Sequence, residues 1–190
     1  MKIDIWSDVR CPFCYIGKHK FETALEQFAH KEAIEVQWHS FELDPDLKTR
    51  TDLSVYDHFA ERKGIDKAQA GQMLQHAAQA AQEVGLTIRF EDSVIANSFK
   101  AHRLIQFAKT KSLGNEIKEA LCRAHFEAGK NVDDTEVLLQ IGLSVGLEGA
   151  ATRSVLDSNA FADAVRADEQ AANERGIRGV PFFVFNNQYA

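Results

Sequence analysis

The sequence predicts an α/β protein in which a long helical segment interrupts a small sheet. Three observations lead to this fold class: a strand–helix–strand pattern over residues 2–43, a helical pattern from about residue 53 to 175, and a β-prone run at 180–185. With 190 residues, the chain is long enough for one substantial core or for one domain that carries an insertion.

The first segment has the pattern of a βαβ unit. Lys2–Ser7 alternates as a strand does, a helical pattern follows from Pro12, and Ala33–Leu43 alternates again. An apolar stripe on this helix is expected from Phe21, Ala24, Leu25 and Phe28. Because the links are short, the two strands should lie parallel with a right-handed crossover.

The middle of the chain shows no convincing strand pattern and predicts a series of helices. We expect them over Ser54–Lys63, Lys67–Val84, Ser98–Lys111, Glu116–Ala128, Thr135–Val145 and Ala160–Arg175. Glycines in a left-handed conformation should end helices at Gly64, Gly85, Gly114, Gly129, Gly146 and Gly176. Asp66 is expected to be the N-cap of the second helix.

The end of the chain predicts a third strand. Val180–Phe185 is wholly apolar, as is typical of a buried central strand, and Pro181 must then lie at its start. Asn186 and Asn187 indicate a turn. A hairpin partner strand should follow beyond Ala190, so we expect the chain to be truncated relative to a complete fold.

Composition narrows the function classes. The net charge is −6 with no basic stripe, which argues against a nucleic-acid partner. No apolar run approaches the ~20 residues that a membrane span needs. The start lacks the pattern of a secretory signal, and three cysteines are an odd count for a disulfide-stapled secreted scaffold. We therefore expect a cytoplasmic protein.

Two of the three cysteines stand in the stretch "DVRCPFCYIG", between the first strand and the first helix. Cys11 is expected at the N-cap, with Pro12 in the first helical turn and Cys14 one turn later on the same side. The unpaired amides at that helix end favour a thiolate and should lower the pKa of Cys11. The pattern favours a redox pair, while half of a zinc site or two inert core cysteines remain open.

The chain resembles the thioredoxin superfamily, and more narrowly the DsbA-like dithiol-disulfide isomerases of the FrnE type, which were first linked to polyketide biosynthesis. The matching segments are "DVRCPFCYIGKHKFE", "FELDPDL", "NSFKAHRLIQFAK" and "GIRGVPFFVFN". The resemblance implies a thioredoxin-like α/β fold with an all-helical insertion between an N-terminal βαβ unit and a C-terminal β-hairpin. The expected division is 1–50, 51–158 and 159–190.

The same resemblance assigns roles to residues. Cys11 is expected to be the nucleophile and Cys14 the resolving cysteine, with Pro181 as a cis-proline that faces them and keeps metals off the thiols. The backbone of Val180 would then be free to pair with an extended substrate segment. The dipeptide between the cysteines is Pro-Phe without histidine, which argues against a strongly oxidising potential.

The resemblance implies a thiol-disulfide oxidoreductase or isomerase that acts on protein or small-molecule thiols and disulfides. No cofactor is expected, although glutathione could be the redox partner, and the protein should be a monomer or a homodimer. The alternative is a glutathione-dependent enzyme like the 2-hydroxychromene-2-carboxylate isomerases or kappa-class transferases. These share the insertion and a segment like Asn97–Arg103, but generally have serine in place of Cys11.

Several further residues are candidates for binding substrate. Phe13 is the aromatic residue most expected to be exposed beside the cysteines, with Trp6 and Tyr15 as further members of an apolar platform. His102 could face a cleft between the insertion and the thioredoxin part, or could be a packed histidine. Asn97 is a cleft residue by resemblance and a helix N-terminal residue by its sequence context.

The third cysteine offers a different interpretation of the chain. Cys122 and His125 lie three residues apart in a helical pattern, so they share a face. Together with Cys11 and Cys14 they could supply a Cys₃His zinc set, which would make the protein a non-enzymatic zinc-stabilised module. Cys122 could equally be a small core residue, and we expect no metal site.

Overall fold

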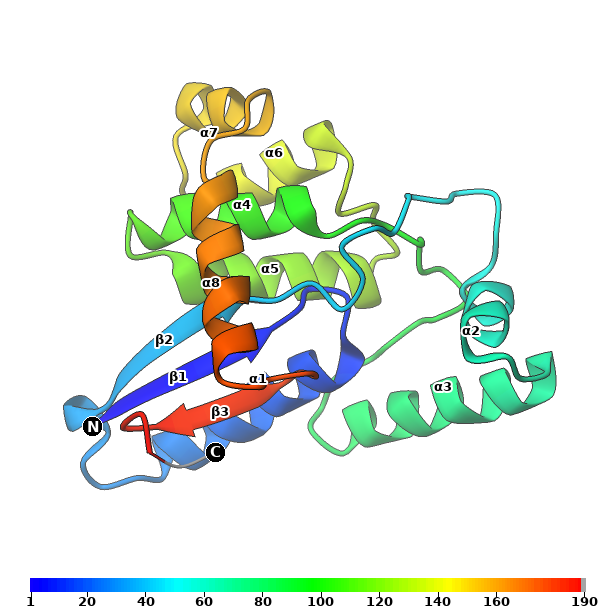
Figure 1. The fold of residues 1–190 in the computed structure, drawn as a ribbon, viewed down its shortest axis with the longest axis horizontal. Coiled ribbons are helices and arrows are strands. Elements are labelled where there is room, and N and C mark those ends of the chain that lie inside the picture. Colours follow the sequence, from blue (N-terminus) through cyan, green and yellow to red (C-terminus); the bar gives the residue numbers. More distant parts are fainter. Residues whose placement is uncertain (189–190) are drawn as a thin grey trace.

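The computed structural model describes residues 1–188 and contains one three-stranded sheet (Figure 1). The strands are β1 (Lys2–Ser7), β2 (Glu35–Ser40) and β3 (Phe182–Phe185), in the order β2-β1-β3. β1 pairs with β2 in parallel and with β3 in antiparallel fashion. The predicted βαβ unit and the third strand are therefore confirmed.

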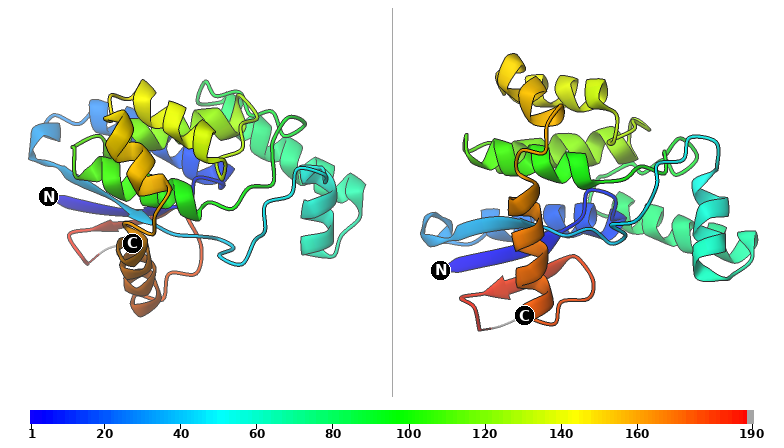
Figure 2. Two further views of the ribbon diagram at one scale, coloured as in Figure 1. Left: turned by 90° about the horizontal axis from the view of Figure 1, so that it is seen from above. Right: turned by 45° about the horizontal axis from the view of Figure 1, so that its top comes forward.

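Helices surround this sheet unevenly. They are α1 (Pro12–Glu26), the 3₁₀ turn Lys31–Ala33, α2 (Val55–Lys63), α3 (Lys67–Gln82), α4 (Phe99–Lys109), α5 (Gly114–Phe126), α6 (Thr135–Ser144), α7 (Gly149–Leu156) and α8 (Ala162–Glu174). In Figure 1, α4 to α7 form a stack beside β2, while α3 lies beside the start of α1 and α2 packs on the far end of α3. Figure 2 shows α8 and α1 on opposite faces of the sheet.

The alternation along β1 explains the two faces. Ile3 and Ile5 point to the α1 side and pack with Trp38 and partly buried residues that include Phe21 of α1. Trp6 points the other way and packs with Ala172, near the end of α8. Both faces of the central strand are thus covered, which fits its nearly complete burial.

A polar network attaches α8 to its face of the sheet. The two ring nitrogens of His39 lie 2.7 Å from Asp4 Oδ1 and 2.7 Å from Asp168 Oδ1. Trp6 Nε1 donates to the backbone oxygen of Asp168 over 3.0 Å and its ring stacks on His39. These groups lie between strands and helix, so the network positions α8 on the sheet.

Local signals at helix ends were mostly predictive. Asp66 caps α3 in a capping box with Gln69. Left-handed glycines occur at the predicted positions 64, 85, 129, 146 and 176. Gly114 is the exception because it begins α5, and Ser112 adopts the positive φ of 59° in its place. Helix α7 was missed because its eight residues are too short for a clear period.

Two predictions about burial are wrong. β3 is an edge strand and only partly buried, because β1 alone has strands on both sides within residues 1–188. The stripe expected on α1 is only partly buried: Phe21 packs against the core, whereas Ala24 is exposed and Phe28 lies exposed beyond the end of the helix.

Asn186 and Asn187 both have positive φ and form the predicted turn, closed by a hydrogen bond from Gln188 N to Phe185 O. The expected partner strand lies outside the described residues. Among residues 1–188, no helix combines the length and apolar character that crossing a membrane requires.

Candidate active site

Cys11 and Cys14 occupy the first turn of α1, directly after β1 and its short loop. Cys11 is the N-cap residue with extended backbone angles, and Pro12 follows in the first turn, as predicted. No side chain caps this helix, so its amides face the sulfur end of Cys11. Both thiols are free; Cys11 is 5% exposed and Cys14 is 1% exposed. The more accessible thiol is therefore the first one.

The two thiols differ in acidity. A hydrogen bond from the Cys14 thiol is the main reason that the pKa of Cys11 is lowered, and the amides of Cys14 and Phe13 act in the same direction. Burial opposes this effect, as does the negative charge of Asp8. Burial raises the pKa of Cys14 well above its ordinary value, and the neighbouring Cys11 raises it further. This pairing gives one thiol that ionises readily and one that keeps its proton.

A loop from the other end of the chain meets Cys11. The Sγ of Cys11 lies 3.5 Å from the backbone oxygen of Val180, and the thiol donates a hydrogen bond to this oxygen. The Val180–Pro181 peptide bond is cis, as the resemblance implied. Pro181 also packs on α1 at Gly17, where an added Cβ would lie only 3.1 Å from Pro181 Cγ. Gly17 therefore permits the close approach of this loop, a role that the sequence reasoning missed.

A buried lysine lies behind Cys14. Lys118 of α5 is fully buried, and its Nζ sits 5.2 Å from the centre of the Trp38 ring. Within residues 1–188 its ammonium forms no ion pair with a carboxylate. Its charge lowers the pKa of Cys14, against the stronger effect of burial. Lys118 is thus a cation placed to act on the second thiol.

Asp8 organises the loop that leads to Cys11. Its oxygens accept from the backbone N–H of Arg10 over 3.1 Å and of Leu43 over 2.9 Å. His102 Nε2 lies 3.3 Å from Asp8 Oδ1, and both side chains are fully buried. Burial opposes ionisation, but the hydrogen bond and charge of His102 hold the pKa of Asp8 well below its usual range. Asp8 is therefore an ionised anchor.

Sequence comparison identifies the family. The sequence model of the DSBA-like thioredoxin domain matches residues 2–190. The chain belongs to this family. Its fold is accordingly the thioredoxin-like α/β fold that the resemblance implied.

Known proteins similar to this DSBA-like chain cover nearly all of it. A probable DsbA oxidoreductase of Streptomyces coelicolor has 36% identity and a TM-score of 0.93, over 100% of this chain and 82% of that chain. The uncharacterized protein YwbO of Bacillus subtilis (strain 168) is 29% identical over 97% of this chain and 86% of its own length. The cytosolic disulfide reductase DsbM of Pseudomonas aeruginosa shares the fold, with 17% identity, a TM-score of 0.69, and coverage of 99% and 87%.

The third cysteine of this DSBA-like domain is a core residue. Cys122 is completely buried, and its Sγ lies 4.0 Å from the backbone oxygen of Val9. Burial raises the pKa of Cys122 to about 12. Cys11, Cys14, Cys122 and His125 do not gather their ligand atoms at one point, so the Cys₃His alternative lacks its geometry.

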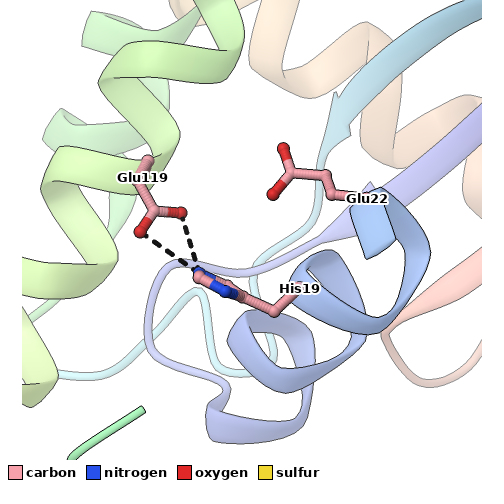
Figure 3. A group of neighbouring side chains, drawn as sticks. All are labelled: His19, Glu22 and Glu119. Carbon is pink, nitrogen blue, oxygen red and sulfur yellow. Dashed lines mark hydrogen bonds and ion pairs between the residues drawn. The ribbon is translucent and has the colours of Figure 1, made fainter. Parts of the chain in front are cut away.

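Within residues 1–188, three neighbouring side chains do bring possible metal-ligand atoms within 4.8 Å of one another: His19, Glu22 and Glu119 (Figure 3). A cation of the protein itself already lies among them. The buried Lys18 Nζ contacts Glu22 over 2.8 Å and Glu119 over 2.7 Å. The cluster is therefore an internal salt bridge between α1 and α5.

The residues predicted to bind substrate differ in their exposure and contacts. Phe13 is 47% exposed beside Cys11, whereas Trp6 and Tyr15 are buried and form no apolar platform. His102 is wholly buried against Asp8, so it does not reach a cleft. Asn97 Nδ2 donates to Leu47 O over 3.0 Å, and its Oδ1 accepts from the N–H of Phe99 at the start of α4. Asn97 thus connects a loop to a helix end.

Proposed function

We propose that this protein is a thiol-disulfide oxidoreductase or isomerase of the FrnE type, with Cys11 as nucleophile and Cys14 as resolving cysteine. The observation that carries the proposal is the opposite shift of two adjacent thiols at one helix end: the pKa of Cys11 is lowered and that of Cys14 is raised. The position of Cys11 against Val180 and Pro181 adds support, because it leaves the nucleophile beside an irregular loop.

The proposed reductive cycle has two exchange steps. The Cys11 thiolate attacks one sulfur of a substrate disulfide, the substrate S–S bond breaks, and the departing thiolate takes up a proton. Cys14 then loses its proton and attacks Cys11 in the mixed disulfide. The second substrate thiolate leaves, and an enzyme disulfide remains. Two electrons pass to the substrate, and an external thiol such as glutathione restores the enzyme. The reverse sequence oxidises a dithiol.

Two groups are proposed to receive the substrate beside Cys11. Phe13 offers an exposed aromatic surface next to the nucleophile. The N–H of Val180 makes no backbone hydrogen bond within the described chain, so it is free to pair with an extended segment. Protein disulfides and small disulfides both fit this arrangement. Cytosolic DsbM, which has also been solved with GSH, is consistent with a cytoplasmic site of action and a glutathione partner.

Insulin reduction by wild-type and variant protein tests the proposal. We expect Cys11→Ser to lose activity by about 1000-fold or more, and Cys14→Ser to accumulate a mixed disulfide that mass spectrometry detects. The alternative, a glutathione-dependent isomerase or transferase, has no need of a second thiol. Full activity of Cys14→Ser toward an aromatic substrate with glutathione, together with absent insulin reduction by the wild type, would overturn the proposal.

The direction of exchange follows from the reduction potential of the Cys11–Cys14 couple. A value near about −270 mV, as in thioredoxin, indicates a reductase, and one near about −120 mV indicates an oxidant. Equilibration with glutathione buffers of stated ratio, followed by alkylation and mass spectrometry, measures it directly.

A further inference from the structure

A cavity of about 290 Å³ lies beside the start of α1, on the side of α2 and α3. Pro12, which immediately follows Cys11, forms part of its wall. Most of the remaining lining is apolar and includes Phe59, Leu74, Phe90 and Phe126. The size and lining are those of a site for a small organic molecule rather than for a lone ion.

Three polar atoms in this lining have no partner. Arg10 Nη1, His58 Nε2 and His125 Nδ1 are each buried and make no hydrogen bond within residues 1–188. His125 is only 5% exposed as a whole. Buried polar groups in native proteins are nearly always hydrogen-bonded, because an unpaired one is destabilising. Three unpaired groups in one cavity therefore point to a ligand that supplies their partners.

The charged side chains around the cavity determine whether it favours a cation or an anion. Among residues 1–188, the Arg10 guanidinium forms no ion pair, because its acidic neighbours are engaged elsewhere. Asp8 accepts from two backbone amides and faces His102, and Asp44 pairs with Arg62 over 2.8 Å. The cavity thus presents an unpaired cation in apolar surroundings, where an anion binds more strongly than in water.

The two histidines are neutral at pH 7 and add hydrogen bonds without adding charge. Burial, with the nearby charge of Arg10, lowers the pKa of His125 to about 4. Burial, again followed by Arg10, also lowers the pKa of His58. A neutral imidazole has one N–H to donate, and His125 directs its own to the backbone of Lys130. The guanidinium of Arg10 and the ring of His58 are therefore the donors that match the acceptor sites of a carboxylate.

We propose that this cavity binds the carboxylate of a small organic acid with an apolar body, through Arg10 and His58, with His125 in the cavity wall. Because Pro12 joins the cavity wall to Cys11, the preferred substrates would be disulfides that carry such an acid next to the reacting sulfur. This second statement rests on the proposed thiol exchange, whereas the binding of the acid does not.

Equilibrium binding tests the cavity independently of the thiols. We expect calorimetry to show benzoate binding at least about 10-fold more tightly than its uncharged analogue benzamide, as a charge-assisted contact would give. Arg10→Gln should remove this preference, Arg10→Lys should keep part of it, and His58→Leu should weaken benzoate about 3-fold. The matched control is Arg89→Gln, since Arg89 is exposed and outside the lining. Equal affinity for benzoate and benzamide would overturn the proposal.

Disulfide kinetics test the substrate class. The reduced protein is mixed with dithiobis(nitrobenzoate), which carries carboxylates, or with neutral dithiodipyridine, and the two rate constants are compared as a ratio. We expect this ratio to fall about 10-fold in Arg10→Gln and to stay within about 2-fold in Arg89→Gln. An unchanged ratio in Arg10→Gln, with both reagents reacting at Cys11, overturns only the substrate class. Failure of Cys11 to react with either reagent overturns the proposed function instead.

Discussion

Cys11 and Cys122 are both buried free thiols, yet one lies at the beginning of a helix and the other within one. The pKa of Cys11 is lowered by a hydrogen bond from Cys14 and by nearby amides. Burial raises the pKa of Cys122 to about 12, and the backbone oxygen of Val9 is its sole hydrogen-bond partner within residues 1–188. The comparison teaches that hydrogen-bond donors at a helix end can offset the burial that, without such donors, keeps a cysteine of this chain protonated.

The largest expected effect is the difference in alkylation between these two thiols. In the native reduced protein at pH 7, Cys11 should react with iodoacetamide at least about 1000-fold faster than Cys122, because only the thiolate is the nucleophile. Peptide mass spectrometry over a time course measures both rates in one sample. Repetition in denaturant is the control, since there the two rates should converge. Comparable alkylation rates of Cys11 and Cys122 in the native protein would contradict the proposed difference in acidity.

The next effect concerns Lys118, whose charge favours ionisation of Cys14. We expect Lys118→Met to slow the resolving step about 10-fold, the change that one pKa unit produces, and to leave alkylation of Cys11 nearly unchanged. Rapid quenching with acid and mass spectrometry should then show a longer-lived mixed disulfide.

Lys20→Met is the matched control for this experiment, because Lys20 is an exposed lysine of α1. If the mixed disulfide disappears equally fast in Lys118→Met and in the control, Lys118 has no part in resolution.

A smaller effect is expected at Gly17, where Pro181 packs against α1. A methyl group at this position must displace the Pro181 ring. We therefore expect the free energy of unfolding of Gly17→Ala to be about 1–2 kcal/mol lower than that of a variant with the same substitution at an unobstructed helix position. The control is Gly71→Ala, whose added Cβ would have no neighbour closer than 4.0 Å and should stabilise α3. Urea unfolding of both variants measures the difference; equal stabilisation would refute the contact.

The smallest effect extends the comparison from thiols to buried carboxylates. Asp8 is held ionised, whereas burial raises the pKa of Glu42 to about 7 despite its contact with Arg166. The pKa of Glu42 is higher in the folded chain than in the unfolded chain, so the folded state favours the protonated carboxyl. This contribution to stability is fully present below about pH 4.5 and is lost as the pH rises through 7.

Glu42→Gln should therefore shrink the fall in melting temperature between pH 5 and pH 8 by about 2–4 °C, as about 1 kcal/mol does in a chain of this size. Scanning calorimetry at the two pH values measures this change. Glu32→Gln, at an exposed position, should show the same decrease in melting temperature between pH 5 and pH 8 as the wild type. An unchanged fall in Glu42→Gln would show that this carboxyl titrates normally.

Local chemistry explains why much of the fold could be predicted from the sequence. Strand alternation gave β1 with its observed bounds, and the capping residues Cys11 and Asp66 placed the starts of two helices. Both signals depend on a few neighbouring residues, which the sequence displays directly. The placement of Cys11 and Cys14 at one helix end could be predicted for the same reason, because their spacing and the helix start are local properties.

Long-range packing explains what the sequence could not show. His102 lies 94 residues from Asp8, and only the folded chain reveals that they are buried together. Lys118 and Arg10 likewise gain their importance because neither forms an ion pair within residues 1–188, which no pattern in the sequence records. The edge position of β3 depends on its neighbours in the sheet and not on its own apolar composition.

The contact between the Cys11 thiol and the Val180 carbonyl can exist only while the sulfur carries its proton. Once that proton leaves, two electron-rich atoms face each other, and the anion is drawn toward the amides of Phe13 and Cys14. The carbonyl has then lost its donor and is open to the N–H of an incoming extended peptide. Under the proposed function, deprotonation of Cys11 would both form the thiolate and free the Val180 carbonyl for the substrate. Substrate binding and the reactivity of Cys11 should therefore rise together as the pH increases.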